Sequence, residues 1–313
     1  MPSTQPATLG AQAERAEAAK GVGFALAAYG FWGLNPLYFK LVDHLPMLEV
    51  LAHRVIWSIL FLLLVVAALR SWRALRAAIG RRRSLAALGL TTLIISANWL
   101  IYIWAINSEQ VLETSLGYYM NPLLSVVLGV VVLRERLTAL QGVAVLLAAA
   151  GVLNLAIGIG EPPWISLSLA LTFAVYGLIR KTIAVGSVEG LLVETTLMLP
   201  IAVGYLTFLG LAGSGSFVGE GFDNTLLLIA SGAVTMLPLI WFTSAARRLR
   251  FSTVGFFQYL APTCHFLLAV FAFGEPFTWT HMVTFALIWT AVGLYVAQSI
   301  IALRRPAAVE GTR

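Results

Sequence analysis

Long apolar stretches separated by short polar segments occupy nearly the whole of this chain. Ten of them have the length of about 20 residues that a helix needs to cross the hydrocarbon core of a bilayer. The strict alternation of an outer-membrane barrel is absent, so the pattern predicts transmembrane helices. We expect them at residues 21–40, 47–69, 84–106, 112–132, 139–158, 163–179, 188–211, 225–246, 252–273 and 279–302.

The two halves of the chain carry the same motif at an offset of 140 residues. Six of the 20 positions from 119 to 138 are identical to their counterparts, which indicates an internal duplication. The predicted units are a first five-helix repeat at 20–158 and a second at 159–302. The repeated residues are Tyr119, Pro122, Leu128, Val130, Glu135 and Thr138, which recur as Tyr259, Pro262, Leu268, Val270, Glu275 and Thr278.

Positively charged residues indicate which loops face the cytoplasm. If the arginine-rich loop at 70–83 is cytoplasmic, then all of the 20 Lys and Arg residues except Lys40 and Arg54 fall on that side. Both termini are then cytoplasmic, and the net charge of +6 is a topology signal that also suits contact with anionic lipid headgroups. The segments 1–19 and 303–313 are expected to be cytoplasmic tails, the first of them disordered and without the features of a cleavable signal peptide.

Five spans per repeat is an odd number, so the second repeat must cross the membrane in the opposite sense to the first. Glu135, between two arginines, is then cytoplasmic, whereas Glu275 lies outside. Inverted repeats are typical of secondary transporters, which bind their substrate near the midplane between the halves. The sequence therefore predicts an all-α membrane protein of ten transmembrane helices arranged as two inverted five-helix repeats.

Composition and motifs narrow the function classes further. Hydrophobic residues make up 59% of the chain and charged residues 11%, more apolar surface than a soluble domain can bury. The one cysteine, Cys264, offers neither a disulfide framework nor zinc spacing. Phosphate-binding, metalloprotease and hydrolase motifs are lacking, so we predict no enzyme, no cofactor and no metal site. A polytopic membrane enzyme, a scaffold or a sensor is the weaker alternative.

Polar and aromatic residues inside the first two predicted spans are candidates for function, because such groups must face protein or water in a membrane. Trp32, Asn35 and Tyr38 surround Pro36, whose ring frees a backbone carbonyl and bends the helix. A bend at a substrate cavity and a bend that serves packing alone are both open. His53 in the second span is either a titrating group for proton coupling or a structural histidine.

Arg54 lies inside the second span, and two interpretations of it stay open. Its guanidinium is suited to hold a substrate carboxylate with two hydrogen bonds. Alternatively it forms a structural ion pair with Glu49, Glu113 or Glu194. Glu194, its repeat equivalent, is the favoured partner, and a role in proton coupling is the other possibility for that acid.

Further aromatic and amide side chains at similar depth complete the predicted substrate cavity. Such a lining suits a small amphipathic solute, although an ordinary aromatic core is the alternative. Glu135 and Glu275 are expected to stabilise helix ends, and the hinges are expected at Pro36, Pro122 and Pro262. The additional cavity residues are Asn98, Trp99, Tyr102, Tyr119, Asn121, Trp241, Gln258, Tyr259 and His265.

Two groups of motifs resemble a known family. Residues 117–123 (GYYMNPL) and 133–137 (LRERL) resemble the EamA family of the drug/metabolite transporter superfamily. Residues 51–54 (LAHR), 98–99 (NW) and 176–181 (YGLIRK) are similar to its RarD branch. The resemblance covers about residues 20–300 and implies ten spans, an inner-membrane exporter and a cavity between the halves, with an amino-acid-like substrate. It does not assign ligand contacts.

The residues and the resemblance together predict a multi-pass transporter of the bacterial inner membrane. It exports small metabolites, above all amino acids including aromatic and other neutral ones, by alternating access. The alternative is proton-coupled drug or multidrug efflux, for which Glu194 or His53 would matter. Its expected partners are a small-molecule substrate and membrane lipid, and nucleic acid is not expected.

Overall fold

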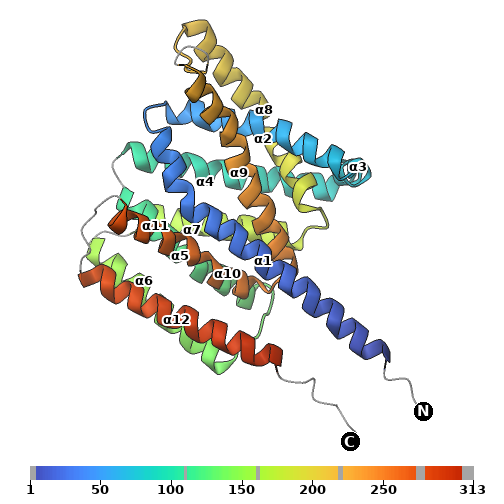
Figure 1. Cartoon of the computed structure of the whole chain (residues 1–313), viewed down its shortest axis with the longest axis vertical. Helices are drawn as coiled ribbons and strands as arrows, with labels where there is room; N and C mark the ends of the chain where they lie inside the picture. The colour runs from blue at the N-terminus through green and yellow to red at the C-terminus, as the bar shows by residue number, and fades with distance from the viewer. Residues whose placement is uncertain (1–4, 109–110, 160–162, 218–220, 273–278, 305–313) are drawn as a thin grey trace, which may run out of the picture.

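The structure, a computed structural model, describes residues 5–108, 111–159, 163–217, 221–272 and 279–304 (Figure 1). These residues are folded into helices and contain no β-strand. The helices are α1 Gln5–Leu41, α2 Met47–Ala68, α3 Trp72–Gly80, α4 Arg82–Asn107, α5 Val111–Val131, α6 Ala139–Ile159, α7 Trp164–Thr182, α8 Ser187–Ala212, α9 Phe222–Arg248, α10 Phe251–Gln258, α11 Leu260–Phe271 and α12 Trp279–Arg304.

Each predicted span coincides with a helix or, at residues 252–273, with the broken pair α10 and α11. Among the described residues, α2, α4, α6, α7, α8, α9 and α12 are long and apolar enough to cross a membrane, which makes seven. A shorter apolar stretch, Leu116–Val131, lies in α5. The all-helical membrane architecture is therefore confirmed, whereas the full count of ten stays a prediction.

The N-terminal segment corrects one expectation. Residues 5–19, predicted to be a disordered tail, belong to α1, which continues without a break into the first predicted span. Ala, Glu, Arg and Gln dominate this segment, and all are strong helix formers. Glu17 pairs with Lys20 at 2.6 Å and with Arg248 of α9 at 3.0 Å, and these two cations hold the pKa of its carboxyl below the usual value.

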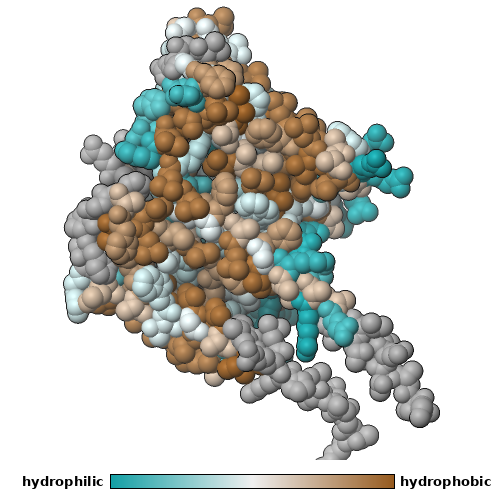
Figure 2. All heavy atoms as spheres, viewed as in Figure 1, coloured by the Kyte–Doolittle hydropathy of each residue, from teal (hydrophilic) through white to brown (hydrophobic). Residues whose placement is uncertain are grey.

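The apolar side chains on the flanks of the bundle point outward, as expected for a protein surrounded by lipid. Leu146 in α6 is 71% exposed, Ile201 in α8 79% and Leu211 in α8 86%. In Figure 2, hydrophobic residues cover much of the visible flank and hydrophilic residues gather toward its ends. A surface of this kind is stable only in contact with hydrocarbon.

Helix packing follows a pattern with two-fold character. Helices α1 and α9 pack together as do α4 and α7, and α2 packs on α9 as α8 does on α4. Helix α5 packs on α7 as α11 does on α1. Three further pairs, α2·α8, α6·α12 and α5·α10, each join two helices at corresponding places in the two halves. Exchanging the halves leaves these pairs unchanged, whereas the smaller contacts α5·α6, α7·α9 and α8·α9 have no counterpart of similar extent among the described residues.

The packed helices enclose two groups of buried side chains. The main core gathers Tyr29, Tyr176 and Phe242 from α1, α7 and α9 with many aliphatic neighbours. The second core gathers Tyr119 from α5, Phe256 and Tyr259 from the α10 region, and Phe285 and Tyr295 from α12. Helices α6 and α12 lie at one edge of the bundle, with α3 and α8 toward the other (Figure 1).

The contact between α2 and α9 depends on a glycine. A Cβ atom at Gly232 would lie 2.5 Å from the carbonyl carbon of Trp57 and 2.6 Å from the backbone nitrogen of Ser58. The Ser58 hydroxyl also donates to the Gly232 carbonyl at 3.0 Å. Only a residue without a side chain lets the two backbones approach this closely.

We expect Gly232→Ala to lower the free energy of unfolding by about 1–3 kcal/mol, because the added methyl meets backbone atoms that cannot rotate away. The melting temperature of the purified protein in detergent measures this. Gly204→Ala in α8 is the matched control, since a Cβ there meets nothing within 4 Å. An equal effect of the two substitutions would contradict the close approach.

Candidate functional site

Arg54 of α2 is the centre of the candidate site. Its Nε donates to the Thr235 hydroxyl of α9 at 2.7 Å, one turn beyond the close contact at Gly232. Its two terminal nitrogens donate to no described residue, and no described carboxylate lies within ion-pair distance. These two nitrogens also keep some accessible surface, since neither is a fully buried atom without a hydrogen-bond partner. The guanidinium therefore keeps its planar outer edge free.

Aromatic rings surround this cation. The guanidinium carbon lies 5.2 Å from the ring centre of Trp99 on α4 and 5.7 Å from that of Phe39 on α1. The hydroxyls of Tyr38, Tyr102 and Tyr118 interact with it electrostatically. An arginine against an aromatic face is stabilised by the ring quadrupole, the more so away from bulk water. The rings hold the cation in place and leave its hydrogen-bond donors unused.

Three hydrogen bonds to other helices hold the segments that carry these rings. The Tyr38 hydroxyl donates to the carbonyl of Leu227 in α9 at 3.0 Å. The Asn98 amide donates to the Leu169 carbonyl at 2.9 Å and to the Thr172 hydroxyl at 2.8 Å, both on α7. Asn98 therefore positions its neighbour Trp99, and its amide donor is already engaged.

Pro36 shapes the next part of the site through the carbonyl that it leaves free. A proline has no N–H for the carbonyl four residues earlier, which here belongs to Trp32. Nε2 of His265 on α11 lies 2.9 Å from that carbonyl oxygen, and the ring must carry its proton there in order to donate. A Cβ at Gly33 would lie 2.5 Å from the Cβ of Cys264, so α1 and α11 touch at this point. The proline and the histidine together join the two helices.

Tyr118 connects this contact to Arg54. Its ring lies 5.8 Å from that of His265 and 6.3 Å from that of Tyr102, edge to face in both cases. Tyr118 keeps 42% of its surface accessible. Asn35, partly buried and one turn from Trp32 and Tyr38 on α1, makes no hydrogen bond with a described residue.

The structure thus brings together Arg54, Trp99, Tyr102, Tyr38 and His265 from the predicted set. It places other members elsewhere. Tyr119 donates to the Pro262 carbonyl at 3.3 Å, and Gln258 accepts from Ser125 at 3.0 Å. Asn121 Oδ1 and the Tyr259 hydroxyl are buried without a hydrogen-bond partner among the described residues. These four residues lie in or beside the second core, where α5 faces α10 and α11.

The remaining predicted residues pack against aromatic rings. Trp32 lies among Tyr29, Phe173 and Phe242, and Trp241 contacts Phe31 at a ring distance of 5.9 Å. The prolines lie inside α1, α5 and α11. Beside Pro262 the helix breaks at Tyr259, which separates α10 from α11. No contact tests whether the prolines act as hinges.

His53 and Glu49 form a separate pair toward the beginning of α2. His53 stacks on Phe217 at 4.7 Å, and neither of its ring nitrogens has a hydrogen-bond partner among the described residues. Glu49 Oε1 accepts from the Ser216 N–H at 2.7 Å, whereas its buried Oε2 makes no hydrogen bond with a described residue. Glu49 is therefore not the partner of Arg54, and the side chain of Glu113 lies outside the described residues.

The expected ion pair of Arg54 with Glu194 is corrected by the structure. Glu194 of α8 lies 3.7 Å from Nε of Arg180, and both side chains are almost fully buried. Its carboxylate also accepts from Thr91 at 2.5 Å and from Tyr176 at 3.2 Å. Equivalent places in the two repeats therefore do not bring the side chains of Arg54 and Glu194 together.

Sequence reasoning missed four residues that matter here. Thr235 is one hydroxyl in an apolar run, and Phe39 is one aromatic among many. Tyr118 stands next to Tyr119, to which the repeat drew attention, but adjacent helix positions point in different directions. Arg180 was expected in a cytoplasmic loop, and no signal in the sequence distinguishes it from the exposed arginines.

Glu135 lies between α5 and α6 and binds the other half of the molecule. Its carboxylate accepts from the N–H of Phe251 at 2.6 Å and from the N–H and hydroxyl of Ser252 at 2.9 and 2.6 Å. These groups form the N-terminus of α10, where a negative charge is stabilising. The expectation that Glu135 stabilises a helix end is confirmed. Its counterpart Glu275 lies outside the described residues.

Comparison with known proteins places the chain among transporters. Residues 19–157 match the EamA-like transporter family. The chain is 47% identical to Protein RarD of Escherichia coli, over 91% of this chain and 97% of that protein. It is 44% identical to a protein of Vibrio cholerae named as a transporter, over 90% and 93% of the two chains. A solved crystal structure with 18% identity shares the fold, at a TM-score of 0.70 over 91% of this chain and 99% of the other.

We expect Glu194→Leu to lower the free energy of unfolding by roughly 3–5 kcal/mol, because it leaves the buried Arg180 charge without its partner. The double change Arg180→Met with Glu194→Leu should recover most of that loss, since no charge then remains buried. Melting of the purified protein in detergent compares the two. A double variant as unstable as the single one would contradict the stranded charge.

Proposed function

Because the chain belongs to the EamA family of the drug/metabolite transporter superfamily, in its RarD branch, we propose that it exports amino acids, including aromatic ones, by alternating access. One observation carries the choice of substrate. A guanidinium inside a predicted span, Arg54, has free hydrogen-bond donors and aromatic neighbours but no carboxylate partner among the described residues.

A substrate carboxylate completes this arrangement. The two terminal nitrogens of Arg54 present parallel N–H donors, the geometry that binds a carboxylate in a fork. A charged group in a membrane protein costs several kcal/mol unless it is paired or wet, and a bound carboxylate removes that cost. The faces of Trp99, Tyr102 and Tyr118 offer a site for an apolar or aromatic side chain. Asn35 on α1, whose amide makes no hydrogen bond with a described residue, is the proposed partner of the amino group.

The accessible surface of Tyr118 marks the place of the proposed cavity. The rings of Tyr102 and His265 pack against that of Tyr118, so residues of α4, α5 and α11 meet there. Tyr119, Asn121, Gln258 and Tyr259, in or beside the second core, remain predicted parts of its wall.

Several features support ten spans in two inverted repeats with both termini in the cytoplasm. The most extensively packed helix pairs map onto one another, or onto themselves, when the halves are exchanged. The groups Arg180–Lys181, Arg247–Arg250 and Arg134–Arg136 are joined to one another by hydrogen bonds at one end of the bundle. An inner-membrane protein places its positively charged end in the cytoplasm.

Alternating access then requires that the halves separate at each end in turn. Glu135 of the first half caps α10 of the second, and Arg250 donates to the Arg136 carbonyl at 2.8 Å. These contacts close the arginine-rich end, so opening toward the cytoplasm must break them. Pro36, Pro122 and Pro262 are the proposed hinges, because each removes a backbone hydrogen bond within its helix.

A second candidate function is proton-driven drug efflux. Its support is the buried neighbourhood of Glu49 and His53, where an acid and an imidazole keep unpartnered atoms. A proton bound there would couple transport to a pH gradient. The free cation at Arg54 argues against cationic drugs, since like charges repel in a low-dielectric site.

We expect Arg54→Gln to reduce amino-acid transport by roughly 10- to 100-fold, because the hydrogen bonds of a charged donor to the carboxylate are lost. Arg54→Lys should not restore it, since an ammonium cannot form the fork. Proteoliposomes measure the uptake of labelled phenylalanine and of its amide, which lacks the carboxylate, with and without a pH gradient.

Arg15→Gln, an exposed charge on α1, is the control and should transport at the wild-type rate. Equal transport of phenylalanine by the Arg54→Gln and wild-type proteins would rule out Arg54 as the anchor. If the wild-type protein moves no amino acid under either condition, the substrate class is wrong. Transport that depends wholly on the pH gradient and accepts apolar drugs would favour the second candidate.

We expect Glu135→Ala to shift the protein toward the state open at the arginine-rich end. A cysteine at position 118, in a Cys264→Ser background, reports this through a membrane-impermeant maleimide. Labelling in inverted vesicles should rise relative to the protein with Glu135 intact, because the cap on α10 is gone. Arg134→Gln removes an exposed charge next to it and should leave labelling unchanged. Unchanged labelling in Glu135→Ala would contradict the role of this contact in closure.

A further inference from the structure

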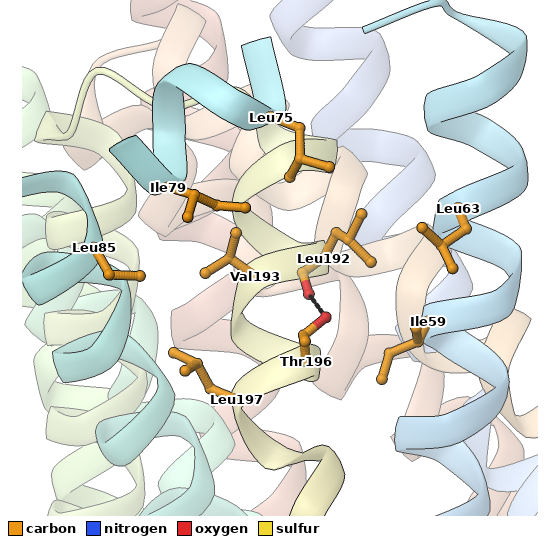
Figure 3. Close-up of a pocket in the computed structure, with 9 residues that line it drawn as sticks. All are labelled: Ile59, Leu63, Leu75, Ile79, Leu85, Leu192, Val193, Thr196 and Leu197. Carbon is orange, nitrogen blue, oxygen red and sulfur yellow. Dashed lines mark hydrogen bonds between the residues drawn. The ribbon is translucent and has the colours of Figure 1, made fainter. Parts of the chain in front are cut away.

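A pocket of about 410 Å³ opens between α2, α3, α4 and α8, away from the Arg54 site (Figure 3). Leu63 of α2, Leu75 and Ile79 of α3, and Leu192 of α8 are among its lining residues. Thr196 is the one polar residue in that lining, and its hydroxyl donates to the Leu192 carbonyl at 2.6 Å. The wall therefore offers hydrocarbon contact and no unused hydrogen-bonding group.

The helix that covers this pocket is amphipathic. Leu75 and Ile79 are four residues apart on α3, so they share a face, and both point into the pocket (Figure 3). Ala78 on the same helix is buried against Leu88 and Val193. A short helix with one apolar face and a basic opposite face is typical of the membrane interface.

Six arginines without a partner among the described residues lie on α3 and beside it. Arg73 and Arg76 lie on the helix, Arg70 precedes it, and Arg81 to Arg83 follow it. All six are exposed, and none forms an ion pair or a side-chain hydrogen bond with a described residue. The sequence contains no acidic residue between Glu49 and Glu109 that could neutralise them. An anion from outside the protein is the natural partner.

We propose that this pocket binds one acyl chain of an anionic membrane phospholipid, whose phosphate is held by the arginines on and beside α3. The volume lies within the range of roughly 300–1,000 Å³ of small-molecule pockets. The arginines lie on and beside the helix that covers the pocket. Arginine binds phosphate with paired hydrogen bonds, and basic segments beside a membrane attract anionic headgroups. A polar metabolite would find no partner in the wall, which assigns the pocket to lipid and the Arg54 site to substrate.

The lipid would also strengthen this corner of the fold. Leu192 and Val193 contact the pocket, and the next residue, Glu194, holds the buried pair with Arg180. A bound chain fills the space between α3 and this turn of α8. Anything that binds the folded state alone raises its stability, so the anionic lipid should raise the melting temperature.

Native mass spectrometry of the full chain in detergent tests the proposal, with dioleoylphosphatidylglycerol and dioleoylphosphatidylcholine as probes. We expect tighter retention of phosphatidylglycerol and a higher melting temperature with it. The double variant Arg73→Gln/Arg76→Gln should bind it roughly tenfold more weakly or worse, because each arginine near the headgroup contributes. Thr196→Phe, which fills the pocket, should weaken both lipids.

The matched control is Arg134→Gln/Arg136→Gln, which removes two exposed arginines from another loop. It should bind phosphatidylglycerol as the wild type does, and an equal loss in the control would mean attraction by net charge alone. Equal binding of the two lipids, unaltered binding after Thr196→Phe, or displacement of the lipid by an amino acid would each overturn the proposal. Melting without lipid verifies that every variant is folded.

Discussion

A polar group in hydrocarbon has no water to bind, and the interior of this bundle follows from that constraint. The carbonyl that Pro36 leaves free is bound by His265, and the Asn98 amide is bound by α7. The carboxylate of Glu194 is held by Arg180 and two hydroxyls. Contacts of this kind hold the helices together. A charged group whose terminal donors bind no described residue is therefore conspicuous, and Arg54 is such a group.

Arg54 and Arg180, which both lie among the packed helices, differ in the way that separates structure from function. Arg180 is fully buried, pairs with Glu194 and donates to the carbonyls of Gly186 and Ser187. Gly190 leaves the room for its guanidinium, because a Cβ there would overlap it. Arg54 has a single hydrogen bond and aromatic faces beside it. A substrate anion can pair with Arg54 without displacing a protein partner, whereas Arg180 has no place for one.

The hydrophobic pattern predicted the helices well because lipid imposes one rule on every span. Each apolar stretch of about 20 residues must be helical, whatever its neighbours. Helix α3 escaped this rule because its nine residues lie along the surface, where the arginines dominated the pattern. The prediction that 5–19 is disordered was wrong because charged and alanine-rich sequences form helices when a partner, here Arg248, binds them. Neither α3 nor the helical segment at 5–19 can be predicted from hydrophobicity alone.

The sequence predicted the type of site, but only some of the residues that form it. Arg54, Trp99 and Tyr102 were found because polar and aromatic groups inside a span are exceptional. The partners of Arg54 were not found, because contacts between helices depend on how each helix is rotated about its axis and how closely the helices pack. The offset of 140 residues pointed to Glu194 for Arg54, but equivalence under a two-fold axis gives the same environment in the other half and not a contact. The approach at Gly232, which places Thr235 under Arg54, could only come from the structure.

The position of each ionic contact indicates which parts of the molecule can move. The three hydrogen bonds of Glu135 lie at the basic end of the bundle, where water can replace them when they break. Their rupture therefore costs far less than the loss of the Arg180–Glu194 pair, whose charges would be left without water or partner. Motion should separate the halves at Glu135 and keep α7 and α8 of the second half together, because Tyr176 and Arg180 of α7 both bind Glu194 of α8. Rigid-body rocking requires an interface that opens at a low free-energy cost beside a group of helices that stays packed.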